Sequence, residues 1–273
     1  MPEKPEVITV AKKLSLKLIG REITNVKVLW DNIIEGITPD EFCKKLKGEK
    51  ILKIDTRGKW IVFHLTDFLL LTHLRMEGKF LYRKKEDEIG KHEHVIITLD
   101  NDLELRFQDV RKFGKMRIIP KVNPEEYEPF LSLGLEAWDK KLTPDYLMDK
   151  YKKKSLPIKS VLLDQSIITG IGNIYADEIL FLSRLNPLTP AKTLNEETLK
   201  SIIENTVITL DKAIIEGGTT IRSYTSEEGV SGLFQNSLLV HSKENEECSV
   251  CKTKIVKIRV GGRGTYYCPE CQK

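Results

Sequence analysis

The sequence CSVCKTKIVKIRVGGRGTYYCPEC, residues 248–271, decides the fold of the last part of the chain. Two Cys-x-x-Cys pairs stand on either side of a strand–turn–strand pattern at 254–267, and this spacing can place four thiolates around Zn²⁺ at about 2.3 Å. Two disulfides or a redox motif are the alternatives. We disfavour both because no thioredoxin-like βαβ pattern is present and because we expect a cytoplasmic location, where thiols stay reduced. The predicted ligands of one structural zinc ion are Cys248, Cys251, Cys268 and Cys271.

Four thiolates leave zinc no open position, so the ion would supply order and no chemistry. The ordered part is a hairpin with Arg263 at its tip, and a rigid basic hairpin fits a nucleic-acid groove. On these residues alone, a binding module and an enzyme are equally good interpretations. Cys43 is left over and is interpreted as an inert thiol.

Upstream of the ribbon, the sequence TGIGN at 169–173 lies between two segments with helical periodicity. Gly170 and Gly172 permit a tight turn, and Asn173 can cap the following helix. Backbone N–H groups at that helix start form an anion site suited to a phosphate, and Lys159 is placed one helix upstream to join it. A plain helix–turn–helix packing motif explains the glycines equally well.

The rest of the chain separates into two textures, with the change near 131–140. Residues 5–19 predict a helix, and short runs rich in β-branched and aromatic residues between 22 and 119 predict an antiparallel β-sandwich or barrel. Helical periodicity dominates beyond the change, where Thr143 and Pro144 are typical of a helix start. The expected helices there span about 144–153, 159–165, 173–185 and 196–216.

Composition sets the limits on function. Hydrophobic residues make up 40% and charged residues 31% of the 273 residues, which suits a soluble protein with a real core. The net charge of +4 permits nucleic-acid binding without requiring it. The start lacks signal-peptide features and the longest apolar runs are too short to span a membrane. We therefore expect a cytoplasmic protein with no membrane partner, and we assume a monomer.

The first residues suggest a nucleophile. Met1 precedes a small residue and is expected to be removed, which would leave Pro2 as a free secondary amine. Such an amine can attack a sugar C1′ and form an iminium, and an α-amine has a pKa of about 8, so more of it is neutral at pH 7 than of a lysine. Glu3 follows directly, and a carboxyl beside a nucleophile is well placed to move protons.

Six motifs occur in order along essentially the whole chain. They are MPExPEV at the start, RGK at 57–59, HLRMEG at 73–78, DVRKFG at 109–114, LLDQS…GIGNIYADE at 162–178 and GGRGTYYCPECQ at 261–272. Together they closely resemble the bacterial formamidopyrimidine-DNA glycosylase family. The resemblance implies an α+β fold: an N-terminal antiparallel β-sandwich with flanking helices, then a helical domain with a helix-two-turn-helix element and a zinc ribbon. We place these parts at 1–133, 134–236 and 237–273.

The resemblance also implies an activity and a partner, damaged double-stranded DNA. The family excises oxidised purines (8-oxoguanine and formamidopyrimidines) and then cuts the strand by β- and δ-elimination. Carried over to matching positions, Pro2 would be the nucleophile that forms a Schiff base, and Glu3 the acid/base. Lys59 would contact phosphate and assist proton transfer, and Arg263 would hold a phosphate at the reacting nucleotide.

The enzyme must extrude the damaged nucleotide from the helix and fill the hole it leaves. Met76, Arg111 and Phe113 match the family's filling residues, with Arg111 able to hydrogen-bond the orphaned cytosine. Met76 and Phe113 stand in charged turns, which indicates exposure. The further DNA contacts implied are His73, His92, Lys159 and Asn173. Residues 219–233 resemble a loop that closes over the lesion.

Three departures and two alternatives stay open. Lys4, Gly264 and Ser223 stand where the family commonly has leucine, serine and an acid, and none of them removes a catalytic group. One alternative is an endonuclease VIII-like glycosylase for oxidised pyrimidines. The other is a non-catalytic zinc-containing DNA-binding protein.

Overall fold

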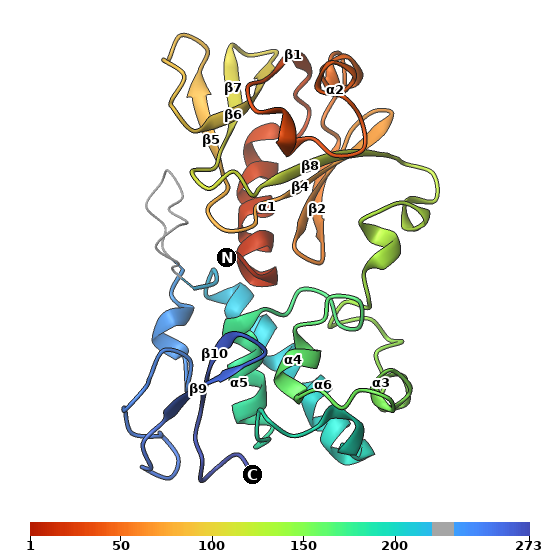
Figure 1. Cartoon of the computed structure of the whole chain (residues 1–273). Coiled ribbons are helices and arrows are strands. Elements are labelled where there is room, and N and C mark those ends of the chain that lie inside the picture. The colour runs from red at the N-terminus through yellow and green to blue at the C-terminus, as the bar shows by residue number, and fades with distance from the viewer. Residues whose placement is uncertain (220–231) are drawn as a thin grey trace. The chain divides into compact units, whose positions relative to one another are not determined.

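The computed structural model describes residues 1–219 and 232–273, and these form two compact units (Figure 1). The first unit consists mainly of Met1–Pro2 and Glu6–Leu131. The second consists of Glu3–Pro5, Ser132–Thr219 and Leu233–Lys273. Within the described ranges, no helix has both the length and the apolar character needed to cross a membrane.

The first unit is an antiparallel β-sandwich, as the strand patterns predict. Its two four-stranded sheets have the orders β1-β6-β7-β5 and β2-β3-β4-β8. Their inner faces share one hydrophobic core, which the helix α1 (Lys4–Leu18) completes with Val7, Val10 and Ala11. The strands are β1 (Ile23–Val28), β2 (Lys53–Arg57), β3 (Trp60–His64), β4 (Phe68–His73), β5 (Lys79–Lys84), β6 (Glu93–Leu99), β7 (Leu103–Gln108) and β8 (Lys115–Pro120).

One helix in this unit departs from the prediction of strands and turns alone between 22 and 119. The helix α2 (Pro39–Leu46) begins after Thr38, whose hydroxyl accepts a hydrogen bond from Glu41 N at 3.2 Å. Proline at the first helical position and acids in the first turn complete a standard helix start. Phe42 and Leu46 are buried in the core, so α2 is a flanking helix of the sandwich.

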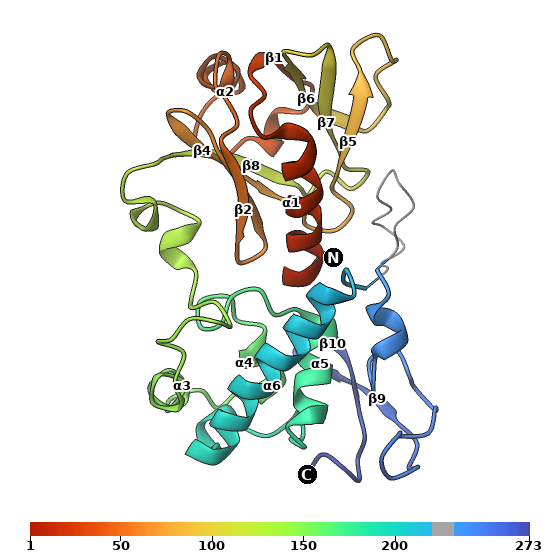
Figure 2. The same cartoon turned by 180° about the vertical axis from the view of Figure 1, so that it is seen from behind.

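The second unit is helical and ends in the zinc hairpin. Its helices are α3 (Pro144–Tyr151), α4 (Ile158–Leu162), α5 (Asn173–Leu182) and α6 (Glu196–Ile215), and the hairpin strands are β9 (Val256–Val260) and β10 (Arg263–Tyr267). α6 packs against α3 and α5, and it runs along the unit in the view from behind (Figure 2). Short 3-10 helices span Asp31–Ile33, Pro124–Glu126, Phe130–Ser132, Ala191–Thr193 and Phe234–Ser237.

The helix starts in this unit follow their predicted chemistry. Thr143 accepts from Tyr146 N at 3.2 Å and Asn195 accepts from Thr198 N at 2.9 Å, which caps α3 and α6. The start of α5 differs from the prediction, because its N-cap is Gly172 and the Asn173 side chain makes no capping bond. The α+β fold class predicted from the motifs is confirmed.

Candidate functional site

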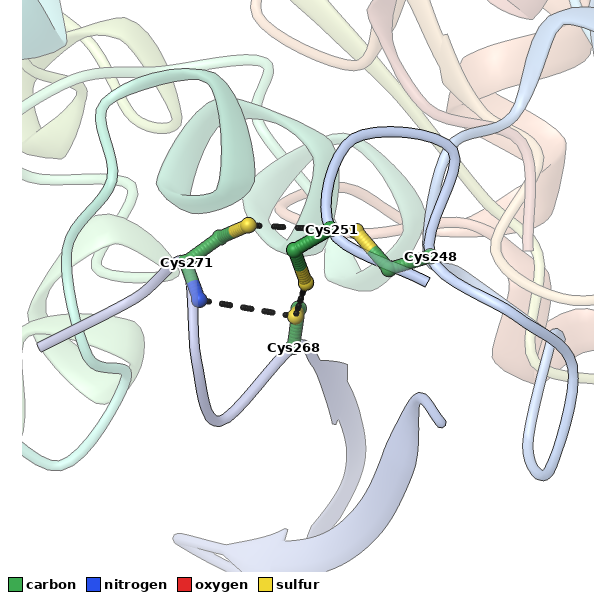
Figure 3. A group of neighbouring side chains, drawn as sticks. All are labelled: Cys248, Cys251, Cys268 and Cys271. Atoms are coloured by element: carbon green, nitrogen blue, oxygen red, sulfur yellow. Dashed lines mark hydrogen bonds between the residues drawn. The ribbon is translucent and has the colours of Figure 1, made fainter. Parts of the chain in front are cut away.

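The four predicted cysteines form one cluster at the base of the β9–β10 hairpin (Figure 3). All four Sγ atoms lie within 4.8 Å of one another; the Cys251–Cys268 pair is 3.4 Å apart and the Cys248–Cys271 pair 3.9 Å apart. A disulfide would require about 2.05 Å. Four Zn–S bonds of about 2.3 Å place tetrahedral sulfurs about 3.8 Å apart, which these spacings match. The cluster is a structural zinc site.

Residues 3–5 pack onto the start of α5, inside the second unit. The Glu3 carboxylate accepts hydrogen bonds from Ile174 N at 3.0 Å and Tyr175 N at 3.4 Å, and Lys4 N donates to Gly170 O at 3.1 Å. Glu3 is 3% exposed, and a Cβ added at Gly172 would overlap its carboxyl group. Glycine is therefore required at 172 so that Glu3 can approach the helix.

This contact corrects one sequence-based expectation. The anion site at the start of α5 is real, but the anion that Ile174 N and Tyr175 N bind is the chain's own Glu3 carboxylate. A DNA phosphate does not have these two donors available while Glu3 is in place. The glycine turn thus serves to position Glu3.

The zinc hairpin is joined to the same helix start. Asn173 Nδ2 donates to Gly264 O at 2.9 Å, which places the Arg263–Gly264 tip beside the first residue of α5. A surface cavity of about 640 Å³ adjoins this contact and is lined by Asn173, His241, Lys257 and Arg259, among others. The exposed side chains of Lys257, Arg259 and Arg263 make this face strongly cationic, which suits phosphate. Lys257 and Arg259 are not among the site residues predicted from the sequence, although both stand between the two Cys-x-x-Cys pairs.

Lys159, a predicted phosphate contact, lies inside the second unit. Its side chain is fully buried, with Nζ 2.5 Å from Asp177 Oδ1 and 2.8 Å from Asn173 O. Burial lowers the pKa of Lys159, and Asp177 opposes that shift. A direct phosphate contact would require the Lys159 ammonium to leave Asp177, so the DNA contact of Lys159 stays a prediction.

Asp177 links Lys159 to the segment that leads into the zinc ribbon. Its second oxygen, Oδ2, lies 2.7 Å from His241 Nδ1, and the His241 ring packs edge-on against Tyr266 of β10 with centroids 5.0 Å apart. The neighbouring Glu178 accepts three backbone hydrogen bonds from 239–241. These polar contacts were missed from the sequence, because adjacent acids inside a helix carry no signal that they are buried.

In the first unit, Lys59 and His73 lie together at one end of the sandwich. Gly58 and Lys59 form the β2–β3 turn, and the next residue, Trp60, is the cross-strand partner of His73. The Trp60 and His73 rings meet edge-on at 5.0 Å. Burial, then Arg75 and Lys59, lower the pKa of His73 to about 3. Because its Nδ1 accepts from Arg75 N at 3.0 Å, the neutral ring carries its hydrogen on Nε2.

The Met76 turn and the Arg111–Phe113 turn meet on one aromatic ring. Residues 74–78 connect β4 to β5 and residues 109–114 connect β7 to β8, so both turns cross between the same two sheets. A Cβ added at Gly78 or Gly114 would come within 2.7 or 2.6 Å of the Phe107 ring. The two glycine turns therefore sit side by side.

Both turns present side chains to the surface. Phe113 is 49% exposed, Arg111 is exposed with its guanidinium 4.9 Å from the Phe113 ring centroid, and Met76 is half-buried. The expected exposure of Phe113 is confirmed. His92 is half-buried, and its carbonyl accepts from Asp109 N at 3.0 Å, which joins it to the same end of the sandwich. Most of the predicted lesion loop, 220–231, lies outside the described residues.

Comparison with known proteins first defines the class. Models of the formamidopyrimidine-DNA glycosylase N-terminal domain, of the H2TH domain of the same enzymes, and of the zinc finger found in FPG and IleRS match residues 1–116, 133–225 and 245–273. The sandwich, the helix-two-turn-helix unit and the zinc hairpin thus make this chain a zinc-containing protein of the glycosylase class.

Full-length relatives then give the family. The formamidopyrimidine-DNA glycosylases of Bacillus cereus and Bacillus subtilis are 43% and 42% identical over the whole of this chain and 99% of their own lengths. A solved complex of Lactococcus lactis Fpg with abasic-site DNA has a TM-score of 0.91 and 34% identity, and the match covers 99% of both chains. The chain belongs to the formamidopyrimidine-DNA glycosylase family, and the resemblance seen in its motifs is confirmed.

Proposed function

We propose that this protein is a bifunctional DNA glycosylase and abasic-site lyase that removes oxidised purines from duplex DNA. The observation that carries the proposal is the packing of Glu3 on the start of α5, beside the Asn173–Gly264 contact. This packing brings Glu3, the proposed acid/base group next to the nucleophile, and the cationic zinc hairpin together in one unit. A protein that only binds DNA has no use for it.

The proposed nucleophile is Pro2, freed by removal of Met1. While Met1 is attached, the Pro2 nitrogen is an amide and cannot attack. As a free amine it would add to C1′ of the deoxyribose while the damaged base leaves with the electron pair of the glycosidic bond. The amine loses its N–H proton, and cleavage of the C1′–O4′ bond with protonation of O4′ then opens the sugar ring and leaves an iminium between C1′ and the Pro2 nitrogen. The iminium acidifies the C2′ proton, and loss of that proton expels the 3′ phosphate. A second elimination then expels the 5′ phosphate.

Glu3 is the proposed acid/base for these transfers. Two backbone donors hold one face of its carboxylate, which fixes the group next to Pro2. Lys59, at the β2–β3 turn beside His73, is the proposed partner for phosphate and proton transfer. His73 offers a neutral Nε2–H donor.

The zinc hairpin supplies the proposed phosphate contacts. Arg263 at the tip and Asn173 at its base would hold the backbone at the reacting nucleotide, and Lys257 and Arg259 add cationic charge along the adjoining cavity. Zinc, when bound by its four thiolates, orders this hairpin and takes no part in the reaction.

The two turns on Phe107 are the proposed filling device. Phe113 and Met76 would enter the space that the extruded nucleotide leaves, and Arg111 would hydrogen-bond the opposite base. His92, at the same end of the sandwich, is a proposed backbone contact. We further propose that the enzyme acts in the cytoplasm, where the reduced thiols that zinc requires persist.

Borohydride trapping tests the chemistry. The purified protein with an 8-oxoguanine duplex should form a covalent adduct on reduction, and Pro2→Gly should lose most strand cleavage but retain DNA binding. Pro5→Ala, in the same segment, is the control and should trap normally. Cleavage by Pro2→Gly at the wild-type rate would remove Pro2 as the nucleophile.

Two further measurements bear on the same proposal. Mass spectrometry of the isolated protein should find a chain that begins at Pro2, and an intact Met1 in fully active protein would contradict the mechanism. Rates on duplexes with 8-oxoguanine or thymine glycol should favour the purine lesion. The opposite preference would identify an enzyme for oxidised pyrimidines.

A further inference from the structure

The turn that carries Arg111 and Phe113 is organised by a single buried carboxylate, Asp109. One oxygen, Oδ1, accepts from Arg111 N at 3.0 Å, and the other, Oδ2, accepts from Phe113 N at 2.8 Å and from Gly114 N at 2.7 Å. Asp109 is 0% exposed. Three backbone N–H groups therefore compensate the burial of this carboxylate. Among the residues that the structure describes, no cation pairs with it.

The backbone of Asp109 is fixed as firmly as its side chain. His94 Nε2 donates to Asp109 O at 2.8 Å, and Asp109 N donates to His92 O at 3.0 Å. The carboxylate is thus fixed relative to the end of the sheet. Because it binds the N–H groups of the residues that point outward, it sets the direction in which Arg111 and Phe113 leave the surface.

Lys112 holds the turn from its flank. It adopts a left-handed backbone conformation, with φ of 58°, and its Nζ lies 3.8 Å from the centroid of the Trp30 ring. That conformation costs free energy for a residue other than glycine. The bonds to Asp109 on both sides of Lys112 offset this cost, so the shape of the turn depends on the carboxylate.

We propose that Asp109 is the positioning residue of the filling device. Before DNA binds, it already holds Arg111 and Phe113 in the arrangement that they need to enter the duplex. Ordering these two residues therefore costs no part of the free energy of DNA binding. This inference rests on the proposed function and adds to it a residue that touches neither DNA nor the reacting atoms.

Asp109→Asn is the sharpest variant because it preserves shape and removes one acceptor. An amide whose oxygen faces Phe113 N and Gly114 N must turn its NH₂ toward Arg111 N, where two donors then oppose each other. The reverse orientation loses the two shorter bonds. Glu49→Gln is the matched control, because Glu49 is also buried and its carboxylate accepts one backbone bond, from Asp67 N at 2.9 Å, in a turn without filling residues.

The expected effect falls on extrusion and not on elimination. Single-turnover excision of 8-oxoguanine opposite cytosine should slow about tenfold in Asp109→Asn, the factor that one hydrogen bond to a charged group carries. Cleavage of a duplex with a preformed abasic site should slow less than about threefold, because a site without a base needs the least unstacking. The preference for cytosine over adenine opposite the lesion should narrow, since Arg111 reads that base.

Several outcomes would overturn the inference. If wild-type protein cleaves the lesion but Asp109→Asn matches it in rate and in opposite-base preference, Asp109 does not position the turn. Equal slowing on the lesion and on the abasic site would point to general damage to the fold. If wild-type protein cleaves no oxidised-purine duplex, the proposed function itself fails.

A measurement on the wild type covers the case in which the variant does not fold. Amide hydrogen exchange should show protection at Phe113 and Gly114, although they lie in a surface turn, because their N–H groups bind a buried carboxylate. Exchange at the rate of an unstructured peptide would contradict the geometry directly.

Discussion

The buried ion pair between Lys159 and Asp177 gives the sharpest test of the second unit. Both side chains are 0% exposed, and Lys159 also donates to Asn173 O. Lys159→Met fills similar space but leaves Asp177 buried with His241 as its remaining partner. Breaking a buried pair on one side costs about 3–5 kcal/mol, and we expect about 3 kcal/mol because His241 stays. For a unit of this size that lowers the melting temperature by about 10 °C.

The control for this change is Lys154→Met. Lys154 pairs with Asp164 at 2.9 Å, but both side chains are about one-third exposed, 35% and 33%. Exposed pairs contribute about 0–1 kcal/mol, so this variant should unfold nearly as wild type does. Zinc release to a chromophoric chelator during urea or thermal unfolding reports on the second unit specifically. The double variant Lys159→Met/Asp177→Leu should recover part of the lost stability.

The same variant separates two roles for Lys159. If the residue is buried as described, the salt dependence of DNA binding by folded Lys159→Met should equal that of wild type. A direct phosphate contact would lower the slope of log K against log salt by about 0.9. A variant as stable as Lys154→Met with a reduced slope would refute the burial and favour the phosphate contact predicted from the sequence.

Three further predictions test other parts of the molecule. The folded-state pKa of His73 is about 3 against an ordinary 6.5, so the unfolded chain binds a proton between these values that the folded chain does not. The free energy of unfolding of wild type, measured with urea, should therefore fall by about 1.4 kcal/mol per pH unit relative to that of His73→Gln as the pH drops below about 6.5. Parallel curves of unfolding free energy against pH for the two proteins would contradict this. Gly172→Ala should push Glu3 off the start of α5 and reduce strand cleavage much more than DNA affinity, and equal losses in both assays would count against it. Cys268→Ser should weaken DNA binding measured by fluorescence anisotropy, because the Arg263 hairpin loses its zinc, while unchanged affinity would exclude the hairpin as a major contact.

Local sequence signals predicted a large part of the fold, but not evenly. The same Thr-Pro-Asp start occurs at 38–40 and at 143–145, and both begin helices with the same capping bond. At 143 this start predicts a helix because it opens a helical region, whereas at 38 strand-like runs surround it and obscure the signal. Strand β2 also carries little hydrophobic signal, because only one of its five residues is buried. It forms because β3 is available to pair with it.

The candidate site divides in the same way. The four cysteines were predictable because metal geometry restricts their spacing, and the exposure of Phe113 was predictable because its neighbours are charged. The partner of the α5 start was not, because a helix start binds any anion and the sequence does not say whether a phosphate or Glu3 will occupy it. The interior positions of Lys159 and Asp109 were equally hidden, because polar residues signal burial only once their partners are known.

One consequence concerns the order in which the protein is made. Residues 3–5 are synthesised long before α5, yet they belong to a unit built mostly from residues beyond 131. A growing chain can fold its sandwich early, but residues 3–5 cannot dock until α5 emerges. Incomplete chains that lack α5, including products of a truncated gene, cannot place Glu3 and should therefore be unable to cut DNA.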